Sequence, residues 1–155
     1  MKKQLKNFKS ITFFIFIMFG ISNCLADENL VKPLVFHGGY TFSSFKGQKS
    51  AAIYLTLINA GNNDIRIKSI KTDLAKKAEI HEIISEKDII RMSKIDNFLI
   101  KKSQTIFFQP GSTHIMVFGL KEKLVDKKIF EIEILTDDSN TYVVEILVID
   151  KRLRQ

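Results

Sequence analysis

Apolar and polar residues alternate with a period of two along much of this chain, and clusters of turn-forming residues separate the alternating runs. Ile65–Ile70 is the clearest case, and a strand with this pattern buries one face and leaves the other in water. Helical periodicity is almost absent. The pattern predicts an all-β domain of eight or nine short strands, an antiparallel sandwich or barrel, and we favour an antiparallel Greek-key β-sandwich. Seven further runs have strand composition: Ala52–Ile58, Ala78–Ile84, Ile89–Ile95, Ser103–Phe108, Thr113–Phe118, Ile129–Leu135 and Thr141–Ile149.

The segments around these strands carry weaker signals. Leu34–Phe36 suits an edge strand, which the pair Gly38-Gly39 stops or bends. Residues 41–50 are polar and are expected to form a loop. Thr72–Lys77 is the one stretch where a helical turn would fit.

The first 26 residues have the layout of a secretory signal peptide rather than that of a folded element. Four lysines precede an apolar run, Ile11–Ile21, and the small residue Ala26 closes the segment. The run is too short for a comfortable membrane span, which needs about 20 residues, although an uncleaved anchor is the alternative. We therefore expect residues 1–26 to be removed and residues 27–155 to form a single domain without a membrane span.

Cys24 is the only cysteine of the chain, so no intramolecular disulfide can form. The preceding Ile21-Ser22-Asn23 loosely resembles a lipoprotein box, in which the cysteine becomes the lipidated first residue. Asn23 stands where such boxes usually have Gly, Ala or Ser, and cleavage after Ala26 is therefore favoured. In either case the exported domain is held by its core alone.

The formal net charge of +7 overstates the basicity of the expected mature protein. Residues 27–155 carry 20 basic and 17 acidic residues, a mild excess that is spread through the sequence. A nucleic-acid site needs a clustered basic surface, and none is predicted. A weak attraction to acidic membrane or protein surfaces stays open.

Two histidines and two methionines fall in one segment with the spacing H-x10-M-x21-H-x-M: His81, Met92, His114 and Met116. They include every methionine after residue 26 and two of the three histidines. Residues i and i+2 of a strand share a face, so His114 and Met116 are expected to project together. His81 and Met92 fall on two earlier strands, and a Greek-key sandwich can bring such strands to one rim.

Imidazole and thioether ligands together favour copper(I). A thioether is a soft, neutral donor that binds hard ions poorly, whereas Cu(I) accepts sulfur and imidazole in near-tetrahedral geometry. A blue-copper electron-transfer centre needs a thiolate, which residues 27–155 lack. Glu79 and Glu82 flank His81 and are candidates to orient its imidazole. A single Met in a strand is usually core filler, so the prediction depends on the joint confinement of all four residues.

Residues 27–155 show no arrangement typical of a catalytic site. They contain no thiol nucleophile, no Ser-His-Asp order with a nucleophile elbow and no marked carboxylate pair. A copper redox enzyme would have to cycle its metal between Cu(I) and Cu(II), and the neutral ligand set disfavours Cu(II). We therefore predict that the protein is not an enzyme. A β-sandwich interaction module with ordinary His and Met residues is the alternative without a metal.

These features resemble the PCu(A)C family of periplasmic copper chaperones, whose signature has the same H-x10-M-x21-H-x-M spacing. The resemblance covers Val35–Ile149, and this chain departs from the family at Ser112-Thr113 and at Asp88-Ile89-Ile90, both beside the site. The similar motifs are Ala51–Leu55 with Ile58-Asn59, His81-Glu82, Arg91-Met92, Pro110-Gly111 and His114-Ile115-Met116 through Gly119-Leu120.

The resemblance implies a cupredoxin-like β-sandwich in the periplasm that binds one Cu(I) per chain through His81, Met92, His114 and Met116. It also implies a metallochaperone that delivers Cu(I) to the binuclear copper site of cytochrome c oxidase. The expected partner is the copper-bearing oxidase subunit or a Sco-type copper protein, and the expected state is a monomer. A periplasmic copper buffering or detoxification protein would use the same site.

Overall fold

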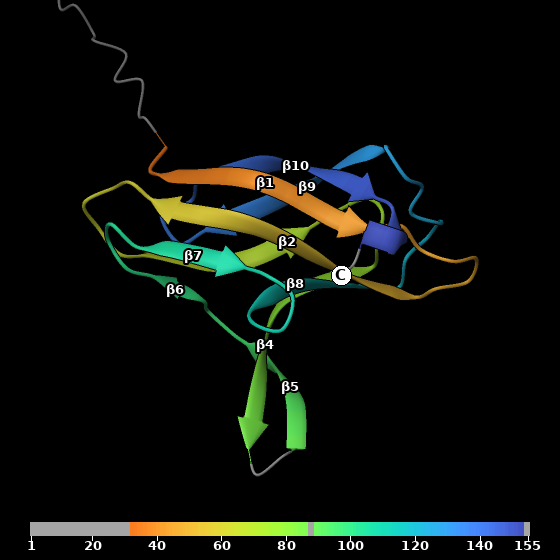
Figure 1. Ribbon diagram of the computed structural model, residues 1–155. Helices are drawn as coiled ribbons and strands as arrows, with labels where there is room; N and C mark the ends of the chain where they lie inside the picture. Colours follow the sequence, from red (N-terminus) through yellow and green to blue (C-terminus); the bar gives the residue numbers. More distant parts are fainter. Residues whose placement is uncertain (1–31, 87–88, 154–155) are drawn as a thin grey trace, which may run out of the picture. The chain divides into compact units, whose positions relative to one another are not determined.

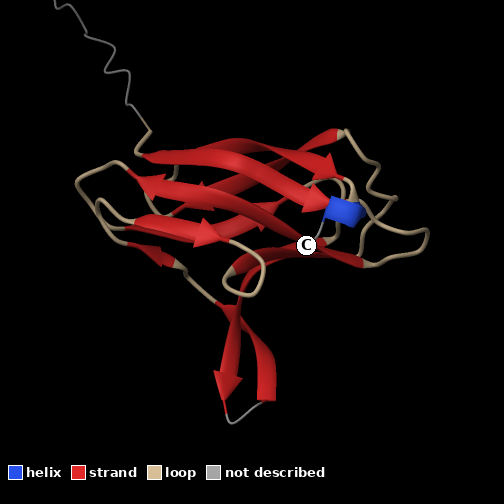
Figure 2. Cartoon of the chain, in the orientation of Figure 1, coloured by secondary structure: helices blue, strands red, loops and turns tan. Residues whose placement is uncertain are grey.

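The computed structural model describes residues 32–86 and 89–153, and the predicted signal peptide lies outside them. The described residues belong to the compact unit Val31–Gln155. Strands make up nearly all of its regular structure, and the helical segment in the described part is the 3-10 turn Lys151–Leu153 (Figure 2). Among these residues no helix has the length and apolar character needed to cross a membrane.

Ten strands form one curled sheet in the order β5-β4-β8-β2-β1-β10-β9-β3-β6, and β7 pairs with β2 as well (Figure 1). β3 also pairs with β4 through Ile70 and Ala78, so the sheet closes around its core. The predicted all-β fold is confirmed. The strands are β1 Leu34–Phe42, β2 Ser50–Asn59, β3 Ile65–Lys71, β4 Lys77–Glu86, β5 Ile89–Ile95, β6 Leu99–Ile100, β7 Thr105–Phe108, β8 His114–Phe118, β9 Ile129–Thr136 and β10 Thr141–Ile149.

The core follows directly from the period-two pattern. Along β10 buried and exposed residues alternate from Thr141 to Val148, as expected for a strand with one face against the core. Aliphatic side chains fill the interior, and removing their surface from water is the main force that holds the fold. The largest fully buried apolar side chains are Ile53, Leu57, Ile100, Ile115, Leu124, Ile132, Ile134 and Ile146.

β1 differs from its predicted form because it continues past the glycine pair and lies inside the sheet. Its pairing with β2 shifts register between His37 and Tyr40, and it then pairs in parallel with β10. A Cβ built on Gly39 would lie 2.5 Å from the carbonyl oxygen of Glu145 on β10. The glycine therefore permits a close approach of two backbones, and the sheet becomes mixed rather than wholly antiparallel. Residues 72–76 form turns, and the helical turn predicted there is not formed.

β4 and β5 form a hairpin that projects from the other strands (Figure 1). β8 pairs with β4 only from Lys77 to His81, whereas β5 pairs with β4 from Ile80 to Glu86. His81 therefore lies where the hairpin leaves the rest of the sheet.

Candidate metal centre

His81 and His114 lie directly opposite each other on β4 and β8. Opposed residues of an antiparallel pair project from the same face, and the two ring centroids are 6.4 Å apart. Two imidazoles on one ion, with metal–nitrogen bonds of about 2.0 Å, have ring centroids roughly 5–6.5 Å apart. The two rings are therefore close enough to share one metal ion.

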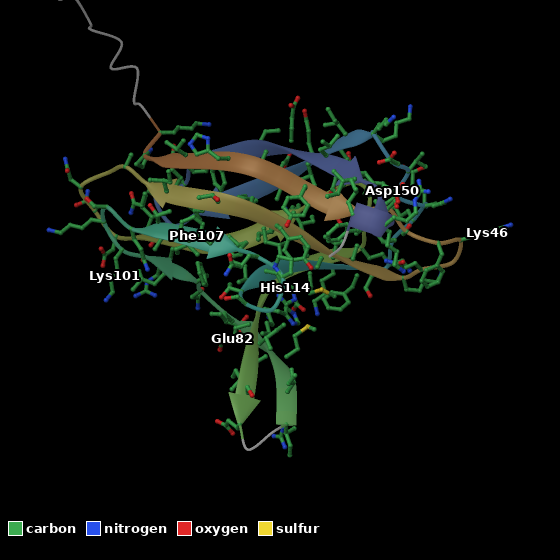
Figure 3. All side chains as sticks on the ribbon, in the orientation of Figure 1. Lys46, Glu82, Lys101, Phe107, His114 and Asp150 are labelled. Atoms are coloured by element: carbon green, nitrogen blue, oxygen red, sulfur yellow. The ribbon has the colours of Figure 1, made fainter. Side chains whose placement is uncertain are left out.

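The two methionines project from the same face of the sheet as the histidines. Met116 follows His114 at i+2 on β8, and Met92 of β5 lies opposite Ile83, which is two residues from His81 on β4. Met92, His114 and Met116 line one pocket of about 320 Å³, in the region where Figure 3 labels His114. Strand register places all four predicted residues on one face of the sheet, but His81 does not itself line the pocket.

A tight turn orients the imidazole of His114. Its Nδ1 lies 2.8 Å from the carbonyl oxygen of Ser112. A carbonyl only accepts hydrogen bonds, so Nδ1 carries the proton and Nε2 of the neutral ring keeps its lone pair. The N–H of Ser112 in turn donates to the carbonyl of Gln109 at 3.2 Å. Gly111 has a φ of 79° in this turn, a conformation open to glycine at little cost.

A carboxylate orients the imidazole of His81. The Nε2–H of His81 donates to Oε2 of Glu79 at 3.2 Å, which leaves Nδ1 with the lone pair. This Nδ1 is buried and has no hydrogen-bond partner among the described residues. Buried polar atoms nearly always have a partner, and a bound metal ion would supply one here.

Two lysines keep Glu79 ionised. The Nζ of Lys77 lies 2.9 Å and that of Lys94 lies 3.3 Å from Oε1 of Glu79. The hydrogen bond from Lys77, joined by those from His81 and Lys94, lowers the pKa of Glu79 from 4.5 to about 2, although burial acts in the opposite direction. An ionised carboxylate only accepts, so it fixes the tautomer of His81.

Aromatic rings lie beside both histidines, whereas Met92 is open to solvent. The ring of Tyr54 lies 6.4 Å from that of His114, and the ring of Phe118 lies 5.6 Å from that of His81. His114 is only 4% exposed, but Met92 is 54% exposed. Sequence reasoning did not select the two aromatic residues, although both follow the period of two that places them on this face.

The nature of the ligand set limits what the site can hold. Within residues 32–86 and 89–153, His, Cys, Asp and Glu side chains form no group of three that could bind a metal ion. A metal held beside His81 and His114 would need further donors, and the thioethers of Met92 and Met116 lie on the same face of the sheet. Soft donors of this kind favour Cu(I).

Glu82, which the sequence offered as a second carboxylate, and the third histidine, His37, lie elsewhere. Glu82 is one position from His81, so it projects from the opposite face of β4. Of the two candidate carboxylates, only Glu79 contacts the imidazole. His37 lies on β1 beside a separate pocket that includes Phe107, which Figure 3 labels apart from His114.

The fold is that of PCuAC domains of known structure. The copper-bound PCuAC domain from PmoF2 matches with a TM-score of 0.66 and 11% identity over 77% of this chain and 94% of that one. The apo PCuAC domain from PmoF1 matches with a TM-score of 0.64 and 17% identity over 77% of this chain and 95% of that one. CuI-DR1885 from Deinococcus radiodurans matches with a TM-score of 0.62 and 22% identity over 76% of this chain and 78% of that one. At such low identities the likeness establishes the fold, in agreement with the predicted cupredoxin-like sandwich.

The chain belongs to the LpqE-like lipoprotein family, which it matches over residues 32–148. A curated relative is the uncharacterized protein RP573 of Rickettsia prowazekii (strain Madrid E), 34% identical over 100 residues. The match covers 64% of this chain and 55% of RP573. The chain thus spans about half the length of that relative.

Proposed function

We propose that this protein is an exported copper(I) carrier that binds one Cu(I) per chain through His81, Met92, His114 and Met116. The observation that supports this most is the state of the two imidazoles. In each ring one nitrogen donates a hydrogen bond to a protein oxygen, and the other nitrogen keeps its lone pair. Both rings lie on the face of the sheet that the two methionines share. A neutral set of two nitrogen and two sulfur donors suits Cu(I).

The exposure of Met92 supports a carrier rather than a permanent site. A carrier must bind copper tightly and still release it. Because the Met92 side of the pocket is open to solvent, ligands of a partner protein could replace the thioethers one at a time. The two histidines, which are less exposed than Met92, would hold the ion until the exchange is complete.

We further propose a periplasmic location and the binuclear copper site of cytochrome c oxidase as the destination of the copper. The copper-bearing oxidase subunit or a Sco-type copper protein would be the partner. The likeness to copper-bound PCuAC domains and the membership of a lipoprotein family support this proposal. Periplasmic copper buffering would use the same site without a specific recipient.

A competition titration with a Cu(I) chelator tests copper binding. The double variant Met92→Leu with Met116→Leu is expected to lose at least a hundredfold in affinity, because leucine conserves volume but supplies no sulfur donor. Ile83→Leu, which alters the same pocket without touching a donor, serves as the control. A double variant that binds Cu(I) as tightly as the parent would exclude the proposed ligand set.

Transfer kinetics test the destination. The loaded carrier is mixed with an apo copper domain of the oxidase, and transfer is compared with spontaneous loss of copper to a chelator. A carrier is expected to transfer faster than copper dissociates, because the partner's ligands enter while the histidines still hold the ion. Transfer no faster than dissociation would favour buffering.

A further inference from the structure

Three loops meet at one end of the sheet and are tied together by hydrogen bonds. The N–H of Ser44 donates to the carbonyl of Leu124 at 3.1 Å, and the N–H of Leu124 donates back to Oγ of Ser44 at 2.9 Å. The N–H of Lys151 donates to Oγ of Ser43 at 3.0 Å. Figure 3 labels Lys46 and Asp150 on this side of the structure. We call the surface formed by residues 43–49, 119–128 and 150–153 the basic end.

The basic end concentrates the positive charge of residues 27–155. It carries three acidic residues and eight cations, a net charge of +5, whereas the rest of residues 27–155 has a net charge of −2. The sequence spreads these residues over three separate segments, and only the fold collects them. All eight cations are exposed: Lys46, Lys49, Lys121, Lys123, Lys127, Lys128, Lys151 and Arg152.

Apolar side chains project among these cations. Phe45 is 60% exposed, Val125 is 47% exposed and Leu153 is 67% exposed. The Nζ of Lys151 lies 5.5 Å from the centre of the Phe45 ring, so charge and apolar surface are interleaved. A protein that lies on a bilayer combines these two features, because cations attract anionic headgroups while apolar side chains enter the headgroup boundary.

We propose that the basic end is a docking surface for anionic phospholipid bilayers. An acidic protein surface would complement the charge, whereas a bilayer would also accept exposed apolar side chains that come from three separate segments of the chain. This inference is independent of copper binding. It has a consequence for the metal centre, since Ser43, Gln48 and Lys151 also line the pocket of Met92 and Met116. A docked molecule would hold that pocket close to the membrane surface.

Vesicle sedimentation tests the proposal with residues 27–155, which contain the whole described core. Vesicles of phosphatidylcholine alone are compared with vesicles containing about one third phosphatidylglycerol, at low salt and at about 0.15 M salt. The triple variant Lys46→Glu, Lys123→Glu and Lys127→Glu is expected to bind anionic vesicles at least tenfold more weakly. Its control reverses three exposed lysines outside the basic end: Lys68→Glu, Lys101→Glu and Lys102→Glu.

A second pair of variants tests the apolar contribution. Phe45→Ser is expected to lower binding to anionic vesicles severalfold. Phe107→Ser removes a ring that is 59% exposed outside the basic end, close to the 60% of Phe45, and is expected to have no effect.

Three results would overturn the proposal. The parent could fail to bind anionic vesicles at low salt. Both triple variants could lose binding equally, which would indicate a general charge effect. Binding could be unaffected by Phe45→Ser and abolished by soluble polyglutamate, which would assign the basic end to an acidic protein partner.

Discussion

At the residue scale, the period of two decides which carboxylate contacts His81 in the candidate metal centre. Glu79 and Glu82 both lie near His81 in the sequence, but only residues an even number of positions apart share a face of a strand. Glu79 therefore contacts the imidazole at 3.2 Å. Its two lysine partners come from its own strand and from β5, and the lysine on β5 could not be assigned without the register of the hairpin.

Replacing Glu79 tests whether the hydrogen bond that orients the His81 imidazole contributes to the affinity for Cu(I). Glu79→Gln is expected to weaken Cu(I) binding about tenfold, because partners of metal-bound histidines typically contribute 10–100-fold to affinity. Glu82→Gln changes the same charge on the opposite face and is expected to leave affinity unchanged. The chelator titration measures both variants, and equal losses in the two would contradict a positioning role for Glu79.

The lowered pKa of Glu79 also predicts how stability depends on pH. Because its folded pKa of about 2 lies below the ordinary 4.5, its ion pairs stabilise the fold above about pH 4.5, and this contribution is lost as the pH falls toward 2. We expect about 1 kcal/mol, since Lys77 and Lys94 are exposed and water screens them. Urea unfolding of the parent and of Glu79→Gln should therefore differ at pH 6 and converge only as the pH approaches 2, and a constant difference would refute this role.

At the element scale, the β4–β5 hairpin is the part that copper should affect most. Beyond His81 the described pairing of β4 is with β5 alone, and Ile89, Ile90 and Met92 on β5 are each more than half exposed. Few buried contacts hold an element of this kind, so it opens more easily than the core strands. Binding of copper through Met92 would fasten the hairpin to β8.

Hydrogen exchange tests this coupling. In the copper-free protein the amides of β5 should exchange faster than those of β10, and Cu(I) should slow exchange in β5 severalfold while leaving β10 unchanged. Met92→Leu should abolish the slowing in β5. Equal slowing in both strands would indicate general stabilisation rather than a clamp on the hairpin.

At the scale of the whole molecule, periodicity predicted the strands well because each strand buries one face. Ile89–Ile95 and Thr141–Ile149 were predicted with the bounds that the structure gives. The prediction that β1 is an edge strand was wrong, since Gly39 allows a close approach by β10 that no local pattern reveals. Long-range pairing of this kind depends on partners more than 100 residues away in the chain.

The four candidate ligands could be selected from residue type and spacing, but their arrangement could not. Only the register of β4 against β8 and β5 shows that His81, Met92, His114 and Met116 share a face. The same limit applies to charge. The basic residues of the basic end are spread through the sequence, and the neighbouring positions of β8, β2, β1 and β10 in the sheet collect them at one end.

X-ray absorption of the Cu(I)-loaded protein tests the central claim most directly, because it reports the atoms bound to the metal. The proposed site predicts about two nitrogen neighbours at about 2.0 Å and about two sulfur neighbours at about 2.3 Å. The sulfur neighbours should disappear in the variant that combines Met92→Leu with Met116→Leu. A spectrum of the parent with nitrogen and oxygen neighbours alone would contradict the account.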